Sequence, residues 1–496
     1  MFESQRLEHK ISKAEFKTEE PRLRGDLIDA QFELLESEDF PVIVLLSGTD
    51  VLGRSGAASQ LMNWMDARHI NSYAMIRASD EELDRPRMWR FWRALPQKGR
   101  IGIFLNAWYE EPVTDYILGH ISRDQYRQQI EEIRNFEETL VNDGALFVKF
   151  LSLLPRGEEL KVMKRLKKER FAAWKVSKEE IEIVKQSAER HDEIAELVEE
   201  LVSATSTARA PWIPLASGDP RYRDLTIGRT LQEAIRHRLD ERSPPRPIAI
   251  PSELIAPTGT NILDTLDLSK ALDEADYRNR LKKEQRRLTS MTLGKKFEDR
   301  ALVAVFEGND ASGKGGSIRR VVQGLDPRIT RVIPTAAPSD EERAQPYLWR
   351  FWRQIPRRGH VAIFDRCWYG RVLVERVEGF CSEEEWVRAY EEIRAFEAEL
   401  AAYGIIVMKF WLSIDKDEQL NRFKEREKVG YKRYKVTEED WRNRDKWDEY
   451  ARAVHAMVDR TSTIKAPWTL VEANNKYYAR IKVLETINDR LETELR

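Results

Sequence analysis

The chain has 496 residues, of which 41% are hydrophobic and 34% are charged. This length fits two or three domains, or one repeated unit, because a domain usually has about 100–200 residues. Lys and Arg (83 residues) nearly cancel Asp and Glu (85 residues), and the net charge of -2 excludes a globally basic nucleic-acid-binding protein and an acidic disordered tail.

The number of cysteines and the length of the apolar segments indicate in which cellular compartment the protein resides. The two cysteines, Cys367 and Cys381, are too few for a disulfide framework or a cysteine-rich zinc module. No apolar stretch follows the charged N-terminus, so we expect no signal peptide. The longest apolar runs, 42–46 and 301–306, are too short to cross a bilayer. We therefore expect a soluble, cytoplasmic protein that binds neither membrane nor nucleic acid.

Blocks of the sequence recur at one offset. The pentapeptide WRFWR occurs at 89–93 and again at 349–353, 260 residues later. Further pairs at this or nearly this offset are Gly48 with Gly308, WY at 108–109 and 368–369, EEIRNFE (131–137) with EEIRAFE (391–397), VKF (148–150) with MKF (408–410), and TSTARAPW (205–212) with TSTIKAPW (461–468). Such collinear recurrence indicates an internal duplication.

A proline-rich segment separates the two copies. Residues 243–260 contain five prolines and little apolar periodicity, which favours a linker; a proline-rich strap packed on a domain is the alternative. We predict an N-terminal domain over 1–240, a linker over 241–264 and a C-terminal domain over 265–496.

Each half has the pattern of an α/β fold. In the second half, a charged helix over 277–298 precedes the apolar run 301–306, which is typical of a parallel strand covered on both faces. The expected elements that follow are a strand at 360–364, a helix at 383–403, strands at 405–414 and 468–473, and a final helix at 475–495. This alternation predicts a doubly wound parallel sheet with ligands at the carboxyl ends of its strands.

A glycine-rich loop follows the strand 301–306. Residues 308–316 read GNDASGKGG and contain the G-x-x-x-x-G-K core of a phosphate-binding loop. Its glycines allow the backbone amides to turn inward around an anion. We expect Lys314 to supply a point charge for the outer phosphates. The glycines are Gly308, Gly313, Gly315 and Gly316.

The loop departs from the usual pattern at two positions. Gly315 replaces the Ser or Thr that usually binds magnesium, and Asp310 puts a carboxylate inside the loop. That carboxylate would repel a triphosphate unless a cation lay between them. We expect Asp310 to bind Mg²⁺ or to orient the attacking phosphate; an Asp that only caps the turn is the alternative.

Two further segments carry charge toward this loop. Asp365 ends the strand 360–364 at the same sheet edge, as a second magnesium anchor would, and Arg366 and Arg371 flank it. Residues 421–435 hold seven Lys or Arg and two Glu. We interpret this segment as a basic helical lid over a multiply charged substrate, although most charge runs are solvated helix faces.

The first half has lost these features. At the loop position it reads GTDVLGRSG (48–56), so that Arg54 replaces the lysine. The strand-end pair becomes Leu105-Asn106, Glu111 replaces an arginine, and the lid equivalent at 166–175 has fewer cations near its tip. We therefore expect the first half to be catalytically silent.

Together, four motifs of the second half resemble those of the polyphosphate kinase 2 family, and the whole chain resembles its tandem, two-domain form. The motifs are G-x-D-x-x-G-K-G-G (308–316), Y-L-W-R (347–350), D-R-C-W-Y-G-R (365–371) and A-P-W (466–468). One departure is Cys367, where the family usually has Ser, and we expect little consequence from it.

The resemblance implies two tandem thymidylate-kinase-like, P-loop kinase-like domains, each a parallel sheet flanked by helices with a helical lid. It implies transfer of the terminal phosphate of inorganic polyphosphate to a nucleotide with Mg²⁺, and for the fused form conversion of AMP to ADP. Asp310 and Asp365 would bind metal and position the nucleotide. Lys314, Arg366 and lid cations such as Lys432 and Arg433 would bind polyphosphate or the moving phosphoryl group.

Several alternatives remain open from the sequence. Arg350 is a candidate for the AMP phosphate, but no base pocket is evident. The acceptor could be ADP, GMP or GDP, the donor could be ATP, or both halves could form a non-catalytic phosphate-sensing scaffold. The charged helices are compatible with self-association into a homo-oligomer.

Overall fold

A computed structural model describes residues 10–75, 78–152, 189–216, 218–241, 261–428 and 438–496, with 161, 164, 181–182 and 185–186. Contacts divide the chain into two compact units: Met1–Ser79, Met88–Pro244 and Ser339–Trp349 form the first, and Asp80–Arg87, Pro245–Pro338 and Arg350–Arg496 form the second. The predicted lid cations Lys432 and Arg433, the segment 166–175 and linker residues 242–260 lie outside the described residues.

The first unit is built on a five-stranded parallel sheet with the order β2-β3-β1-β4-β5. Its strands are β1 Val42–Ser47, β2 Ile70–Ala74, β3 Ile101–Leu105, β4 Leu146–Leu151 and β5 Trp212–Pro214. Its helices include α1 Lys13–Ser37, α2 Val51–Trp64, η2 Ala67–His69, α4 Trp89–Ala94, α5 Glu110–Ile117, α6 Arg123–Asn142, α10 His191–Thr205, α11 Pro220–Asp240 and the short α14 Asp340–Arg343.

The second unit repeats this sheet with the order β10-β9-β6-β8-β7, again all parallel. Its strands are β6 Ala301–Gly308, β7 Thr330–Pro334, β8 Val361–Asp365, β9 Ile405–Ser413 and β10 Trp468–Glu472. Its helices include α3 Asp80–Leu83, η4 Ile262–Thr265, α12 Glu274–Thr292, η5 Lys295–Phe297, α13 Lys314–Val322, α15 Trp349–Trp352, η6 Trp368–Val372, α16 Val374–Glu378, α17 Glu383–Ala402, α18 Lys416–Lys428, α19 Glu438–Asp445, α20 Trp447–Thr461 and α21 Lys476–Glu494.

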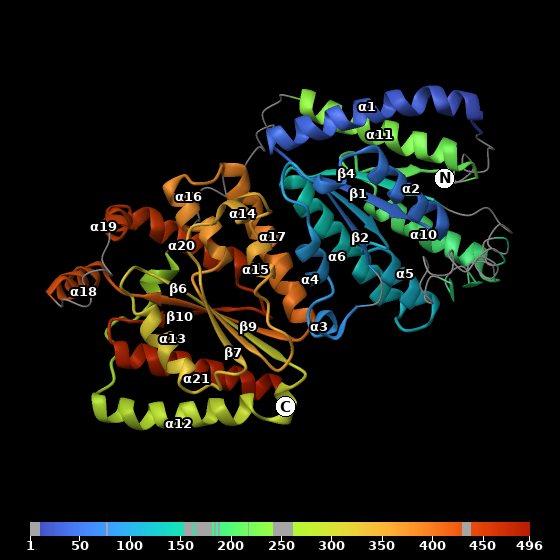
Figure 1. The fold of residues 1–496 in the computed structure, drawn as a ribbon. Helices are drawn as coiled ribbons and strands as arrows, with labels where there is room; N and C mark the ends of the chain where they lie inside the picture. The colour runs from blue at the N-terminus through green and yellow to red at the C-terminus, as the bar shows by residue number, and fades with distance from the viewer. Residues whose placement is uncertain are drawn as a thin grey trace. The chain divides into compact units, whose positions relative to one another are not determined.

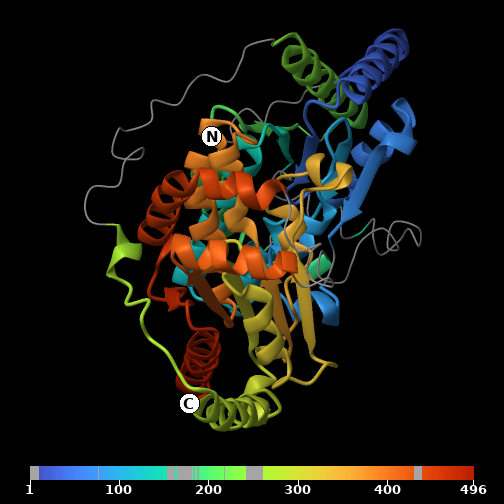
Figure 2. The same ribbon diagram turned by 90° about the vertical axis from the view of Figure 1, so that its left-hand side faces the viewer.

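Helices cover both faces of the second sheet, as the continuous apolar strands predict. One face packs on α13 and α21, with α12 alongside α21, and the other packs on α17 (Figures 1 and 2). The predicted strands and helices are therefore confirmed within a few residues, and so are the two tandem α/β units. Among the described residues, none of the helices has the length and apolar character needed to span a membrane.

A buried ion pair lies beneath the sheet of the second unit. Lys409 Nζ on β9 donates to Glu397 Oε2 on α17 at 2.7 Å and to the carbonyl oxygen of Thr461 at 2.8 Å. Tyr369 OH and Trp368 Nε1 both donate to Glu397 Oε1, at 2.7 and 3.0 Å. The repeated WY, EEIRxFE and KF motifs thus form one hydrogen-bonded network.

The first unit contains the same network. Lys149 Nζ donates to Glu137 Oε2 at 2.9 Å and to the carbonyl oxygen of Thr205 at 2.7 Å, and Trp108 and Tyr109 donate to Glu137. Since every polar atom of the pair has a partner, the desolvation of two interior charges is offset by direct hydrogen bonds.

Burial pushes both members of the second pair toward their neutral forms. It lowers the pKa of Lys409 and raises the pKa of Glu397. The ion pair itself opposes both shifts, so each charge depends on the other.

We expect removal of one partner to be more damaging than neutralisation of both. Lys409→Met should lower the free energy of unfolding of the second unit by about 3–5 kcal/mol, because Glu397 is left as an unpaired interior charge. The double variant Lys409→Met/Glu397→Gln should recover part of this loss in urea unfolding of the full chain. A double variant less stable than the single one would contradict this account.

Candidate active site

The loop between β6 and α13 has the backbone of an anion-binding turn. Gly308 (φ +153°) and Gly313 (φ +105°) both have positive φ angles that disfavour other residues. A β-carbon on Gly308 would lie 2.5 Å from the carbonyl oxygen of Leu412. These two positions turn the chain so that α13 begins at Lys314, and the first N–H groups of this helix have no acceptor inside it.

Lys314 folds back across the loop. Its Nζ donates to the carbonyl oxygens of Gly308 at 2.7 Å and Asn309 at 3.4 Å. Burial, together with the cation of Arg366, lowers the pKa of Lys314, and the nearby carboxylates of Asp310, Asp365 and Glu307 oppose this shift. Both predicted aspartates therefore lie close enough to the predicted lysine to act on its charge.

Asp310 lies within the loop between two donors. Arg366 Nη2 donates to its Oδ1 at 3.0 Å, and Asn443 Nδ2 donates to its Oδ2 at 2.8 Å. The side chain of Asp310 is 11% exposed. A carboxylate held on both oxygens has a fixed orientation at the mouth of the loop.

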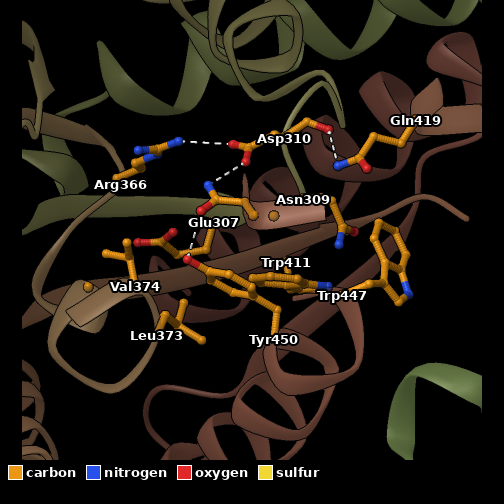
Figure 3. Close-up of a pocket in the computed structure, with 13 residues that line it drawn as sticks. Glu307, Asn309, Asp310, Arg366, Leu373, Val374, Trp411, Gln419, Trp447 and Tyr450 are labelled. Carbon is orange, nitrogen blue, oxygen red and sulfur yellow. Dashed lines mark hydrogen bonds and ion pairs between the residues drawn. The ribbon is translucent and has the colours of Figure 1, made fainter. Parts of the chain in front are cut away.

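The end of β8 brings Asp365 and Arg366 to the same edge. Asp365 is paired with Phe306 in the parallel register of β8 and β6. Arg366 follows with φ +62°, and its backbone N–H donates to the carbonyl oxygen of Phe306 at 3.0 Å. This turn sends the guanidinium toward Asp310, as Figure 3 shows.

A third acid, Glu307, is buried at the end of β6. Its Oε1 accepts hydrogen bonds from the backbone N–H of Cys367 at 2.9 Å and from Cys367 Sγ at 3.4 Å. Burial raises the pKa of Glu307, while the cations of Lys314 and Arg366 oppose the rise. The equivalent position in the first half is Ser47, so this acid is another difference between the halves.

A pocket opens beside the loop (Figure 3). It encloses about 630 Å³, part of which is open to solvent. One side is polar and carries Asp310 and Arg366, whereas the other is apolar and aromatic. The lining residues are Glu307, Gly308, Asn309, Asp310, Arg366, Gly370, Leu373, Val374, Trp411, Gln419, Asn443, Trp447 and Tyr450.

Two predicted arginines lie outside this lining. Arg371 pairs with Glu375 at 2.7 Å and Glu385 at 2.9 Å. Arg350 Nη2 donates to the carbonyl oxygen of Ala336 at 2.8 Å. Their predicted roles toward phosphate and AMP remain predictions, as do those of Lys432 and Arg433.

Arg422, at the start of the predicted lid, braces the loop from outside. Its Nη1 donates to the carbonyl oxygens of Ala311 and Ser312, at 2.9 and 3.0 Å. Its Nη2 donates to those of Ala473 and Asn474, after β10, at 2.7 and 2.8 Å. Arg422, one of the cations of the basic segment 421–435, thus holds the loop against the edge of the sheet.

The equivalent loop of the first unit has a different backbone. There, α2 already begins at Val51, three residues earlier in the aligned numbering than α13. Asp50 caps it, since its Oδ1 accepts from the backbone N–H of Gly53 at 2.9 Å. Arg54 is buried and pairs with Glu110 at 2.8 Å.

Several residues of the pocket escaped the sequence analysis. Three of them are spaced by four and then three residues: Asn443, Trp447 and Tyr450. In a helical segment this spacing places side chains on one side, so it could have indicated a shared face. Glu307 falls between the predicted strand 301–306 and the predicted loop 308–316, and Trp411 falls within the predicted strand 405–414.

Comparisons with known proteins cover nearly the whole chain. The family model for polyphosphate kinase 2 matches residues 10–243 and 271–496. A polyphosphate:AMP phosphotransferase of Pseudomonas aeruginosa is 50% identical over 494 residues, covering 99% of each chain. One from Acinetobacter johnsonii is 34% identical and covers 96% of this chain and 97% of its own. A crystal structure of a polyphosphate kinase 2 from Pseudomonas aeruginosa, 48% identical, superposes with a TM-score of 0.87 over 100% of this chain and 99% of that chain.

Substitutions of two loop glycines should affect stability in different ways. Gly308→Ala should lower the free energy of unfolding of the second unit by about 1–3 kcal/mol through backbone strain, and the close contact with Leu412 should add to this loss. Gly315→Ala should not destabilise it, because its added β-carbon meets no atom within 4 Å. Thermal unfolding of the two variants tests this, and equal stability would contradict the loop geometry.

Proposed function

Since the chain belongs to the polyphosphate kinase 2 family, we propose that it transfers the terminal phosphoryl group of inorganic polyphosphate to AMP and so forms ADP. The observation that carries this proposal is the full-length likeness to polyphosphate:AMP phosphotransferases. We assign the reaction to the C-terminal domain, residues 265–496, where the loop, Lys314, Asp310, Asp365 and Arg366 lie together.

The reaction exchanges one phosphoanhydride bond for another. An oxygen of the AMP phosphate attacks the terminal phosphorus of polyphosphate, the bond to the penultimate phosphate breaks, and the chain leaves one unit shorter. Because both substrates are anions, catalysis depends on positioning and on neutralising charge. Lys314 and Arg366 supply cations, and the loop amides bind the phosphates around the transferring group.

The residues at the loop fit a divalent cation, and we propose Mg²⁺. Among the described residues, no group of three or more His, Cys, Asp or Glu could hold a metal by itself. Mg²⁺ is commonly bound by one or two carboxylates and completed by substrate phosphates and water, which suits Asp310 and Asp365. When bound, such an ion supplies positive charge that lets two anionic substrates approach each other.

We propose that the pocket beside the loop binds the acceptor nucleoside. Its polar side, at Asp310 and Arg366, adjoins the site of transfer, and its aromatic side suits a purine ring. Trp411 in this wall is buried, and its Nε1 has no hydrogen-bond partner in the described part of the chain. That N–H is a donor for a polar atom of the nucleoside.

For the first unit we propose a structural role. The early start of α2, the capping role of Asp50 and the buried Arg54–Glu110 pair leave no lysine-bearing loop of the type that precedes α13. In the second unit, we propose that the predicted lid cations Lys432 and Arg433 bind phosphates of the polyphosphate chain farther from the loop. Cations alone suit this substrate, because polyphosphate has no base to recognise.

Matched aspartate variants test which unit carries the activity. With polyphosphate, AMP and Mg²⁺, Lys314→Ala, Asp310→Asn and Asp365→Asn should each lower kcat about 100- to 1,000-fold, since each removes a charge from the site of transfer. Asp50→Asn, at the position equivalent to Asp310, should keep turnover, and it should change stability little because Asn caps a helix about as well as Asp.

Replacing polyphosphate by ATP in the same assay identifies the donor. Faster ADP formation with ATP, or wild-type turnover in Lys314→Ala, would contradict the proposal. Binding of both substrates without any ADP product would favour a scaffold.

The acceptor pocket makes a separate prediction. Trp447→Ala should raise KM for AMP by about 5- to 100-fold through loss of stacking, with little change in KM for polyphosphate. Trp447→Phe should keep most of the affinity because it retains an aromatic face. An equal rise in both KM values would argue against an acceptor role for this wall.

A further inference from the structure

The helix α19 supplies one of the two side chains that fix Asp310. Asn443, near the end of this helix, donates from Nδ2 to Asp310 Oδ2 at 2.8 Å, while Arg366 occupies Oδ1. Without the amide, Arg366 would be the remaining hydrogen-bond donor to the Asp310 carboxylate among the described residues. The carboxylate would then turn toward Arg366 and reduce the positive charge available to phosphate.

The orientation of the Asn443 amide is set by its other neighbour. Tyr450 OH donates to Asn443 Oδ1 at 3.1 Å, which leaves the amide nitrogen facing the carboxylate. A carboxylate only accepts hydrogen bonds, so the reverse orientation would place two oxygens in contact. The two hydrogen bonds, from Tyr450 to Asn443 and from Asn443 to Asp310, therefore run in one direction.

The same helix also reaches the main chain of Asp310. Arg444 Nη1 donates to Gln419 Oε1 at 3.1 Å, and Gln419 Nε2 donates to the carbonyl oxygen of Asp310 at 3.1 Å. Helix α19 thus contacts the side chain of Asp310 directly and its backbone through one intermediary. In the sequence it directly follows residues 429–437, which include the predicted lid cations.

We propose that Asn443 is a positioning residue that couples helix α19 to the phosphate loop by holding Asp310 in its working orientation. This inference rests on the proposed function. When α19 is in place, Asp310 is shared between Asn443 and Arg366, and Arg366 keeps charge for the phosphates. Displacement of α19 would release the carboxylate onto the arginine, so transfer is faster with the helix seated.

The test compares Asn443→Ala with Asp445→Asn, a change of an exposed residue on the same helix. Asn443→Ala should lower kcat about 10- to 100-fold, in keeping with loss of a hydrogen bond to a charged group. KM for polyphosphate and the melting temperature should match those of Asp445→Asn, which should have wild-type kcat. Asn443→Asp should be slower than Asn443→Ala because it sets a second carboxylate against Asp310.

A second arm separates positioning from a purely structural role. In an Asp310→Asn background, Asn443→Ala should change kcat less than about twofold, because the carboxylate it orients is gone. Wild-type kcat in Asn443→Ala, or an equal loss in both backgrounds, would overturn the inference. A wild-type chain that forms no ADP from polyphosphate and AMP would instead count against the proposed function.

Discussion

The buried lysine–glutamate pair beneath each sheet is the interaction on which the rest of the structure depends. In the second unit it joins four separate parts of the chain: Lys409 on β9, Glu397 on α17, the Trp368-Tyr369 turn after β8, and Thr461 at the end of α20. The turn that it holds directly follows Asp365 and Arg366. An interior charge pair needs every partner in place, so it fixes that turn with little freedom.

The two units separate the requirements of the fold from those of the chemistry. Both keep the ion pair and its aromatic donors, and both keep the order of their strands. They differ at the carboxyl ends of the strands, where only the second unit has the charged residues Lys314, Asp365 and Glu307. A domain can thus lose charges at its strand ends while its interior charges persist, because the two sets share no hydrogen-bonded atoms in the described structure.

Features that depend on neighbouring residues in the sequence could be predicted from it. The apolar runs predicted the strands, and the spacing of glycines around Lys314 predicted the loop, because these signals lie within a few residues of one another. It could not predict that Asn443 reaches Asp310 across 133 residues. Nor could it predict that the tryptophan and tyrosine of the repeated WY motif donate to Glu397, which only the folded chain reveals.

The early start of α2 bears on how readily the first unit could acquire the loop of the second unit in evolution. A change of one codon can restore a lost side chain. It cannot return three loop positions that have become part of a helix to a loop conformation. Asp50 stabilises that helix, so each single step toward an open loop would cost stability before the complete loop could form. The helical backbone at this position, more than the missing lysine, therefore separates the first copy from the second.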